Sequence, residues 1–123
     1  MPPRSRKEVG DWGERIAQSF LRGQGYHILE TNYRCPHGEA DIVAQDGECL
    51  VFVEVKTRRS RSYGAPEESI TPVKEARMSA VADHYLQSRD ITPDQYRIDL
   101  ITVEVESPGR APKVRLIKNA TLG

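Results

Sequence analysis

The feature that most constrains the fold of this chain is an apolar stretch, residues 38–56, with an Asp-Gly pair near its middle. Glycine accepts the positive φ that tight hairpin turns require, so Asp46-Gly47 is a strong hairpin signal. Runs rich in β-branched residues lie on both sides of the pair. The stretch therefore predicts two antiparallel strands, roughly 39–44 and 49–56.

The turn also sets the register of this hairpin. A turn centred on the Asp-Gly pair places Ala44 opposite Cys49. Because side chains alternate along a strand, one face of the hairpin then carries charged residues while the other is apolar and must be core. The charged face holds Glu39, Asp41, Glu54 and Lys56. The apolar face holds Ala40, Ile42, Ala44, Val51, Val53 and Val55.

Two acids of the charged face are placed to act together. In this register Asp41 and Glu54 are diagonal neighbours, with Cβ atoms about 7–8 Å apart or somewhat less. Carboxylates embedded among valines need a cation, because a buried charge without a partner is costly. A hard, oxygen-preferring ion such as Mg²⁺ meets that need. The alternative is a half-exposed hairpin whose acids lie on a solvated face.

A helix is expected over roughly 7–23, after a flexible basic arm at residues 1–7. Glu14 falls at the border of its apolar face, from which a carboxylate can reach a site beside the core. From the residues alone, an ordinary acid of an amphipathic helix is the favoured interpretation of Glu14. The apolar positions that recur at helical spacing are Val9, Trp12, Ile16, Ala17, Phe20 and Leu21.

The remaining elements follow from similar patterns. Residues 26–34 predict the first strand, and a Thr-Pro pair predicts the start of a second helix over about 71–87. A mostly buried strand is expected over 96–106 and an edge strand over 113–117. This order (helix, three strands, helix, one or two strands) predicts an α/β domain with a central mixed sheet flanked by helices.

Cations follow the predicted acids directly. Four of the six residues in 56–61 are basic, and this run would lie at the rim of a site formed by the charged face, where it can neutralise phosphates. A solvated loop is the alternative. Further on, Lys74 lies early in the second helix, where a solvated lysine is the ordinary interpretation. Asp99 interrupts a buried strand, where a structural role such as pairing with Arg97 is expected.

Composition excludes several classes of protein. The 123 residues have a net charge of zero, which argues against a generally basic nucleic-acid coat. No apolar run is long enough to cross a membrane. With no N-terminal signal peptide, Cys35 and Cys49 are expected to be reduced thiols in the cytoplasm. Cys35 and His37 could form half of a zinc site, but the sequence has no second pair of Cys or His residues at the required spacing, so zinc is not expected.

These motifs together resemble a known family. Asp41, followed after a gap by Glu54-Val55-Lys56 in an apolar strand, resembles the signature of restriction-endonuclease-like, or PD-(D/E)xK, nucleases. The wider pattern is similar to the YraN-like family of small, uncharacterised bacterial proteins and, more distantly, to archaeal Holliday junction resolvases. The pattern, over roughly 8–105, comprises Gly13-Glu14, Asn32-Tyr33, Gly38-Glu39-Ala40-Asp41, Val51 to Arg58, Tyr63-Gly64 and Arg97-Ile98-Asp99.

The resemblance implies a single nuclease domain with a restriction-endonuclease-like core over 8–118, followed by a tail at 119–123. It implies hydrolysis of DNA with Mg²⁺, for which Mn²⁺ can substitute. The implied catalytic residues are Asp41, Glu54 and Lys56. The implied metal ligands are Glu14, Asp41, Glu54 and the main-chain carbonyl of Val55. The implied nucleic-acid contacts are Arg58, Arg59, Arg61 and Lys74.

The expected partner is branched or otherwise structured DNA, recognised by shape, because no residues indicate base reading. Similarity to junction resolvases further implies a homodimer. A nucleic-acid-binding module that keeps the fold without cleaving is the main alternative. A phosphohydrolase acting on nucleotides is a third interpretation, weakened by the lack of a Gly-rich phosphate loop.

Overall fold

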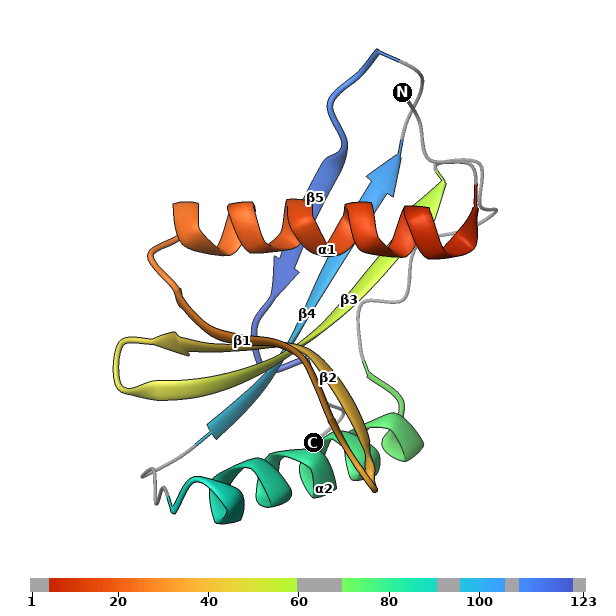
Figure 1. Ribbon diagram of the computed structural model, residues 1–123. Helices are drawn as coiled ribbons and strands as arrows, with labels where there is room; N and C mark the ends of the chain where they lie inside the picture. Colours follow the sequence, from red (N-terminus) through yellow and green to blue (C-terminus); the bar gives the residue numbers. More distant parts are fainter. Residues whose placement is uncertain (1–4, 60–69, 91–95, 106–108, 121–123) are drawn as a thin grey trace.

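Five strands form one mixed sheet with a helix on each face (Figure 1). The structure is a computed structural model that describes residues 5–59, 70–90, 96–105 and 109–120, without the side chains of Arg6 and Arg59. The strand order is β1-β2-β3-β4-β5; β3 and β4 run parallel, and all other neighbours are antiparallel. The predicted α/β class with a helix-flanked mixed sheet is confirmed.

The order of the elements also matches the prediction. The helices and strands are α1 (Arg6–Gly23), β1 (His27–Cys35), β2 (Gly38–Asp46), β3 (Cys49–Arg59), α2 (Pro72–Ser88), β4 (Tyr96–Val105) and β5 (Lys113–Ile117). Because β3 and β4 are parallel, the chain must cross the sheet between them, and α2 lies in that crossover. As predicted, β5 is an edge strand. None of the described helices is long and apolar enough to span a membrane.

Both helices begin at side-chain caps that the sequence supplies. The Ser5 side chain accepts a hydrogen bond from the main-chain N–H of Glu8 at 3.0 Å, and α1 starts one residue before the predicted position. Thr71 caps α2 in the same way, accepting from the N–H of Lys74 at 3.3 Å. Pro72 occupies the first helical position, where its missing N–H costs nothing.

The sheet is covered on both faces, so its central strands are buried on both sides. Val51 and Val53 of β3 pack in the core beneath α1, whereas Leu50 and Phe52 pack in the core beneath α2. The half-exposed hairpin considered as an alternative is therefore wrong for the central residues. The predicted apolar face is found beneath α1, except that Ala40 belongs to the core on the α2 side.

The predicted hairpin register is wrong by two residues. Asp46, rather than Ala44, lies opposite Cys49. The turn consists of Gly47 and Glu48, and Gly47 has a φ of 63°. The glycine therefore occupies the first central position of the turn, as type II′ turns require, instead of the second.

Asp46 stays in the strand because its carboxylate has a distant partner. Arg97 of β4 donates to Asp46 at 2.9 Å, and this hydrogen bond is the main cause that lowers the pKa of Asp46. A shift of two residues preserves the alternation of faces, so the prediction that separates charged from apolar positions survives the error.

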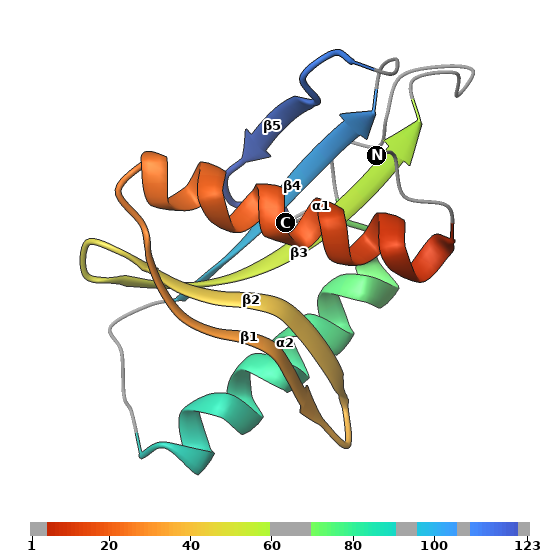
Figure 2. The same ribbon diagram turned by 45° about the horizontal axis from the view of Figure 1, so that its top comes forward.

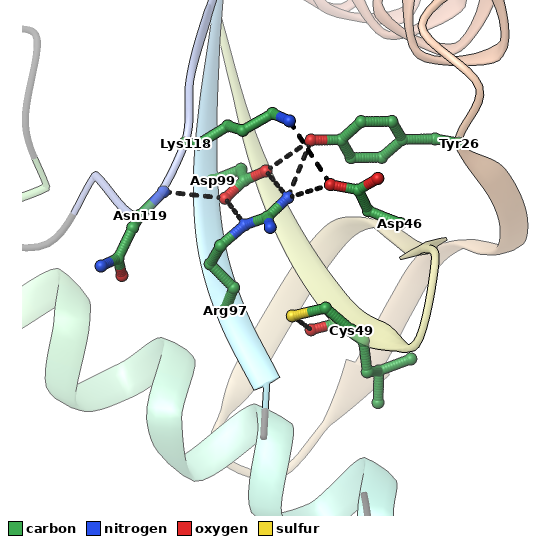
Figure 3. Close-up of polar contacts among 8 residues, drawn as sticks. Tyr26, Asp46, Cys49, Arg97, Asp99, Lys118 and Asn119 are labelled. Carbon is green, nitrogen blue, oxygen red and sulfur yellow. Dashed lines mark hydrogen bonds and ion pairs between the residues drawn. The ribbon is translucent and has the colours of Figure 1, made fainter. Parts of the chain in front are cut away.

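A buried polar network fixes this end of the sheet (Figure 3). Asp99 is fully buried and accepts hydrogen bonds from Arg97 at 2.8 and 2.9 Å, confirming the expected pairing. The hydroxyl of Tyr26 also donates to Asp99, at 3.0 Å, and the main-chain N–H of Asn119 donates at 2.9 Å. With Asp46 as a further partner of Arg97, the network joins four separate segments of the chain.

Replacing Asp99 with Asn should lower the free energy of unfolding by about 3 kcal/mol, because it removes one charge of a buried ion pair and leaves Arg97 with a weaker partner. Urea denaturation at neutral pH measures this loss. Lys118→Met is the control, since Lys118 is an exposed cation 3.5 Å from Asp46 and should contribute less than about 1 kcal/mol. Equal effects of the two variants would contradict the structural role of Asp99.

Candidate active site

Strands β2 and β3 separate where the predicted acids lie. Their pairing ends at Ile42 and Val53, and the next residues in that register are Asp41 and Glu54. Asp41 Oδ2 accepts a hydrogen bond from the main-chain N–H of Val55 at 2.8 Å, so a side chain replaces the carbonyl that continued strand pairing would supply. Figures 1 and 2 show β2 curving toward α2 while β3 continues beside β4. We call this separation the fork.

The electrostatics of the fork are dominated by crowded acids. The pKa of Asp41 is raised to about 7, chiefly by burial and in addition by repulsion from Glu54 and Glu14. The hydrogen bond from Val55 acts in the opposite direction, since it favours the charged carboxylate. Clustered carboxylates of this kind favour binding of a cation, because a cation relieves both the desolvation and the repulsion.

Glu14 reaches the fork from α1, as its border position on that helix suggested. Its side chain is half-buried and shares a hydrogen bond with Asp41. Burial raises the pKa of Glu14, and repulsion from Asp11 and Glu39 raises it further. Three elements therefore contribute acids to one place: α1, β2 and β3.

Close packing of α1 on β3 sets the position of Glu14. A Cβ atom added to Gly13 would lie only 1.8 Å from Oγ1 of Thr57, so a larger residue cannot fit without movement. Gly13 thus allows the helix to cross β3 at short range, directly beside Glu14. In the sequence motif Gly13-Glu14, the glycine is required for packing and the glutamate is a candidate functional residue.

Glu54 is held by a cation from the opposite helix. Lys74 Nζ lies 3.1 Å from Glu54 Oε1, and the Glu54 side chain is only 13% exposed. The start of α2 is anchored just before this pair, because the N–H of buried Ile70 donates to the carbonyl of Ala120 at 2.8 Å. The family resemblance implied that Lys74 lies toward the active site, with a solvated lysine as the alternative, and Glu54 was not identified as its partner.

The other predicted residues are distributed along the strands. Lys56 and Arg58 are half-buried and follow Glu54 at alternate positions of β3, which places them on the same face. Glu39, by contrast, is 53% exposed and pairs with Arg34 at 3.2 Å. The side chain of Arg59, as well as Arg61 and Tyr63, lies outside the described residues.

An aromatic cluster beside the β1–β2 turn was missed by sequence reasoning. His37 packs against His84 of α2, with 6.1 Å between ring centroids, and the hydroxyl of Tyr33 hydrogen-bonds to the same His84 ring. Arg89 lies over the ring of Tyr85 at 4.2 Å. These contacts join residues far apart in the chain, so no local pattern could reveal them.

The donor set suits a hard divalent ion, although the site as it stands is incomplete. In the described part of the chain, no three His, Cys, Asp or Glu side chains already form a metal-binding group. Asp41 and Glu54 nevertheless follow the last paired residues of β2 and β3, and both supply carboxylate oxygens, the ligand type that Mg²⁺ and Mn²⁺ prefer. Lys74 lies at Oε1 of Glu54, so an ion bound by this carboxylate would meet a competing cation. Cys35 and Cys49 are free thiols, as expected.

The model of the uncharacterised protein family UPF0102 matches residues 13–103, from the Gly13-Glu14 motif into β4. The chain belongs to the UPF0102 family. This confirms the YraN-like resemblance of the sequence motifs.

Relatives match the UPF0102 chain over most of its length. A UPF0102 protein of Dehalococcoides mccartyi is 48% identical over 116 residues, which cover 94% of each chain. One from Symbiobacterium thermophilum is 46% identical, covering 93% of this chain and 96% of its own. One from Pelobacter propionicus is 50% identical, covering 85% of this chain and 76% of its own.

Asp41 should make the metal-free protein less stable as pH rises. An aspartate titrates near 4 when unfolded, but Asp41 titrates at about 7 when folded, so the folded state binds more protons between these values. Stability therefore falls from about pH 4 to about pH 7. Asp41→Asn removes this loss and keeps an oxygen to accept from Val55. In EDTA at pH 8, the free energy of unfolding of the variant should exceed that of the wild type by about 4 kcal/mol, because the folded and unfolded pKa values differ by about three.

Urea denaturation at pH 4 and pH 8 measures this effect of Asp41. The two proteins should have similar stability at pH 4, where the folded carboxyl is neutral. Glu39→Gln is the control, because Glu39 is an exposed acid of the same strand. A difference between wild type and Asp41→Asn that does not depend on pH would contradict the assignment.

Gly13→Ala should lower the free energy of unfolding by about 1–3 kcal/mol, because the new Cβ overlaps Thr57. Adding Thr57→Ala should recover part of that loss by removing the closest atom. Gly10→Ala provides a control in the same helix: its Cβ would meet nothing within 4 Å, so it should stabilise the helix by roughly 0.5–1 kcal/mol. Thermal denaturation of the four proteins tests the packing argument, which fails if Gly13→Ala and Gly10→Ala behave alike.

Proposed function

We propose that this UPF0102 protein is a metal-dependent nuclease that hydrolyses phosphodiester bonds in DNA. The observation that carries the proposal is the fork, where Asp41 and Glu54 lie together and the pKa of Asp41 is raised to about 7, chiefly by burial. Perturbed carboxylates gathered at one place are typical of functional sites. Lys56 follows on the same face of β3, which completes the Asp…Glu-x-Lys pattern of restriction-endonuclease-like nucleases.

The residues of the fork have separate roles in this proposal. Glu14, Asp41, Glu54 and the carbonyl of Val55 would hold Mg²⁺ or Mn²⁺. An ion bound there supplies a water of lowered pKa and a polarised phosphate. Lys56 orients the attacking water, or accepts its proton when neutral, and offsets charge that develops on the phosphate oxygens.

The basic residues beyond Lys56 hold the DNA backbone. Arg58 lies on the same face of β3 as Glu54 and Lys56, so flanking phosphates would meet it. We extend this role to Arg59, Arg61 and Lys74. Phosphate contacts position DNA without reading its bases, so the substrate class is DNA of particular shape, such as a branched structure. Paired cuts in such a substrate would require a homodimer.

A cleavage assay tests the proposal. Labelled duplex, single-stranded, flap and four-way-junction DNA are each incubated with the protein in Mg²⁺, Mn²⁺ or EDTA. Cleavage should require the metal and should fall about 10²–10³-fold in Lys56→Ala, because one group that stabilises the transition state is lost. Asp41→Asn should also abolish cleavage while retaining the hydrogen bond from Val55.

Matched controls separate this site from a contaminating nuclease. Lys113→Ala removes an exposed lysine from edge strand β5 and should cleave like the wild type. Circular dichroism confirms that each variant is folded. Equal cleavage by wild type and Lys56→Ala would contradict the proposal. DNA binding without cleavage on every substrate would instead favour the non-catalytic nucleic-acid-binding module.

A further inference from the structure

The ion pair between Lys74 and Glu54 occupies a carboxylate that the proposed metal site needs. Lys74 Nζ is 3.1 Å from Glu54 Oε1. Glu54 belongs to β3 and Lys74 to α2, the next element along the chain. The Glu54 side chain is 13% exposed, whereas that of Lys74 is 42% exposed. The lysine therefore reaches the acid from the solvent side and can leave without disrupting the core.

The ammonium group of Lys74 and a divalent ion would both be attracted to the carboxylate of Glu54, where Lys74 already lies at Oε1. Lys74 brings one positive charge to Glu54, whereas two acids, Asp41 and Glu54, lie side by side where the pairing of β2 and β3 ends. One monovalent cation thus compensates only part of the negative charge at the fork. A divalent ion between Asp41 and Glu54 would compensate both acids, which gives it an advantage over Lys74 at this position.

We propose that Lys74 is an internal counter-ion, which a divalent ion displaces from Glu54 and which is thereby released to bind a DNA phosphate. This inference rests on the proposed nuclease function and adds a coupling between its two ligands. Metal binding would create a phosphate contact, so the ion and the DNA would each strengthen the binding of the other.

The position of Lys74 fits both states. It lies in the first turn of α2, whose start is held by the Thr71 cap and by the hydrogen bond between Ile70 and Ala120. The helix start is fixed, but the long lysine side chain can swing between a carboxylate and a nearby phosphate. The amino end of a helix also favours negative charge, so both Glu54 and a phosphate suit this location.

Metal titration without DNA tests the first half of the proposal. Mn²⁺ and Mg²⁺ are titrated calorimetrically into wild type, Lys74→Met and Lys74→Arg. Lys74→Met should bind Mn²⁺ about three- to ten-fold more tightly, because the competing cation is gone. Lys74→Arg, which retains the charge, should remain close to wild type. Arg77→Met is the matched control, since it removes an exposed cation from the same helix.

DNA binding tests the second half. The measurements use the Lys56→Ala background to prevent cleavage, with fluorescence anisotropy of a labelled four-way junction in Mg²⁺ and in EDTA. Adding Lys74→Met should weaken DNA binding several-fold in Mg²⁺. The dependence of the logarithm of the binding constant on the logarithm of the salt concentration should also become less steep, by about the amount expected for one lost phosphate contact. In EDTA, where Lys74 stays on Glu54, the same substitution should have little effect.

Each failure has a distinct meaning. Unchanged or weaker metal binding by Lys74→Met would overturn the displacement. An equal loss of DNA binding in Mg²⁺ and EDTA would mean a permanent phosphate contact and would also overturn it. If the wild type binds metal but Lys74→Met behaves like it, only this inference fails. If the wild type binds neither Mg²⁺ nor Mn²⁺, the proposed function fails as well.

Discussion

The hydrogen bond from the Val55 N–H to the Asp41 carboxylate is the interaction on which the site depends. A side chain that takes the place of a main-chain acceptor ends the pairing of β2 with β3 while keeping the N–H of Val55 hydrogen-bonded. Strand β2 can then curve toward α2, and β3 continues as the parallel partner of β4. The same carboxylate thus shapes the sheet and provides the central acid of the fork.

Burial on both faces of the sheet alters the electrostatics of the acids at the fork. Because α1 and α2 cover the strands, the acids at the fork lie beside two apolar cores instead of in open solvent. The low polarity of these surroundings raises the pKa of Asp41 and makes a counter-charge valuable. Each helix contributes one charged residue: α1 brings the acid Glu14, and α2 brings the base Lys74.

The local part of the structure could be predicted from sequence, whereas the parts decided by distant residues could not. Alternating and helical hydrophobic patterns gave the elements, their order and the grouping of Asp41 with Glu54. The hairpin register was missed because Asp46 is held in its strand by Arg97, 51 residues away. For the same reason, the partner of Lys74 was not predicted, and the two cores that bury the fork became visible only in three dimensions.

The last described residues have a consequence for how the molecule is made. Asn119 donates to the buried Asp99, and the carbonyl of the neighbouring Ala120 accepts from Ile70 immediately before α2. Ala120 also donates to the carbonyl of Ile98, at 2.9 Å. During synthesis from the amino end, the helix that carries Lys74 can gain this anchor only after Ala120 has been made. A nascent chain therefore lacks a finished site until the segment that follows β5 has been synthesised.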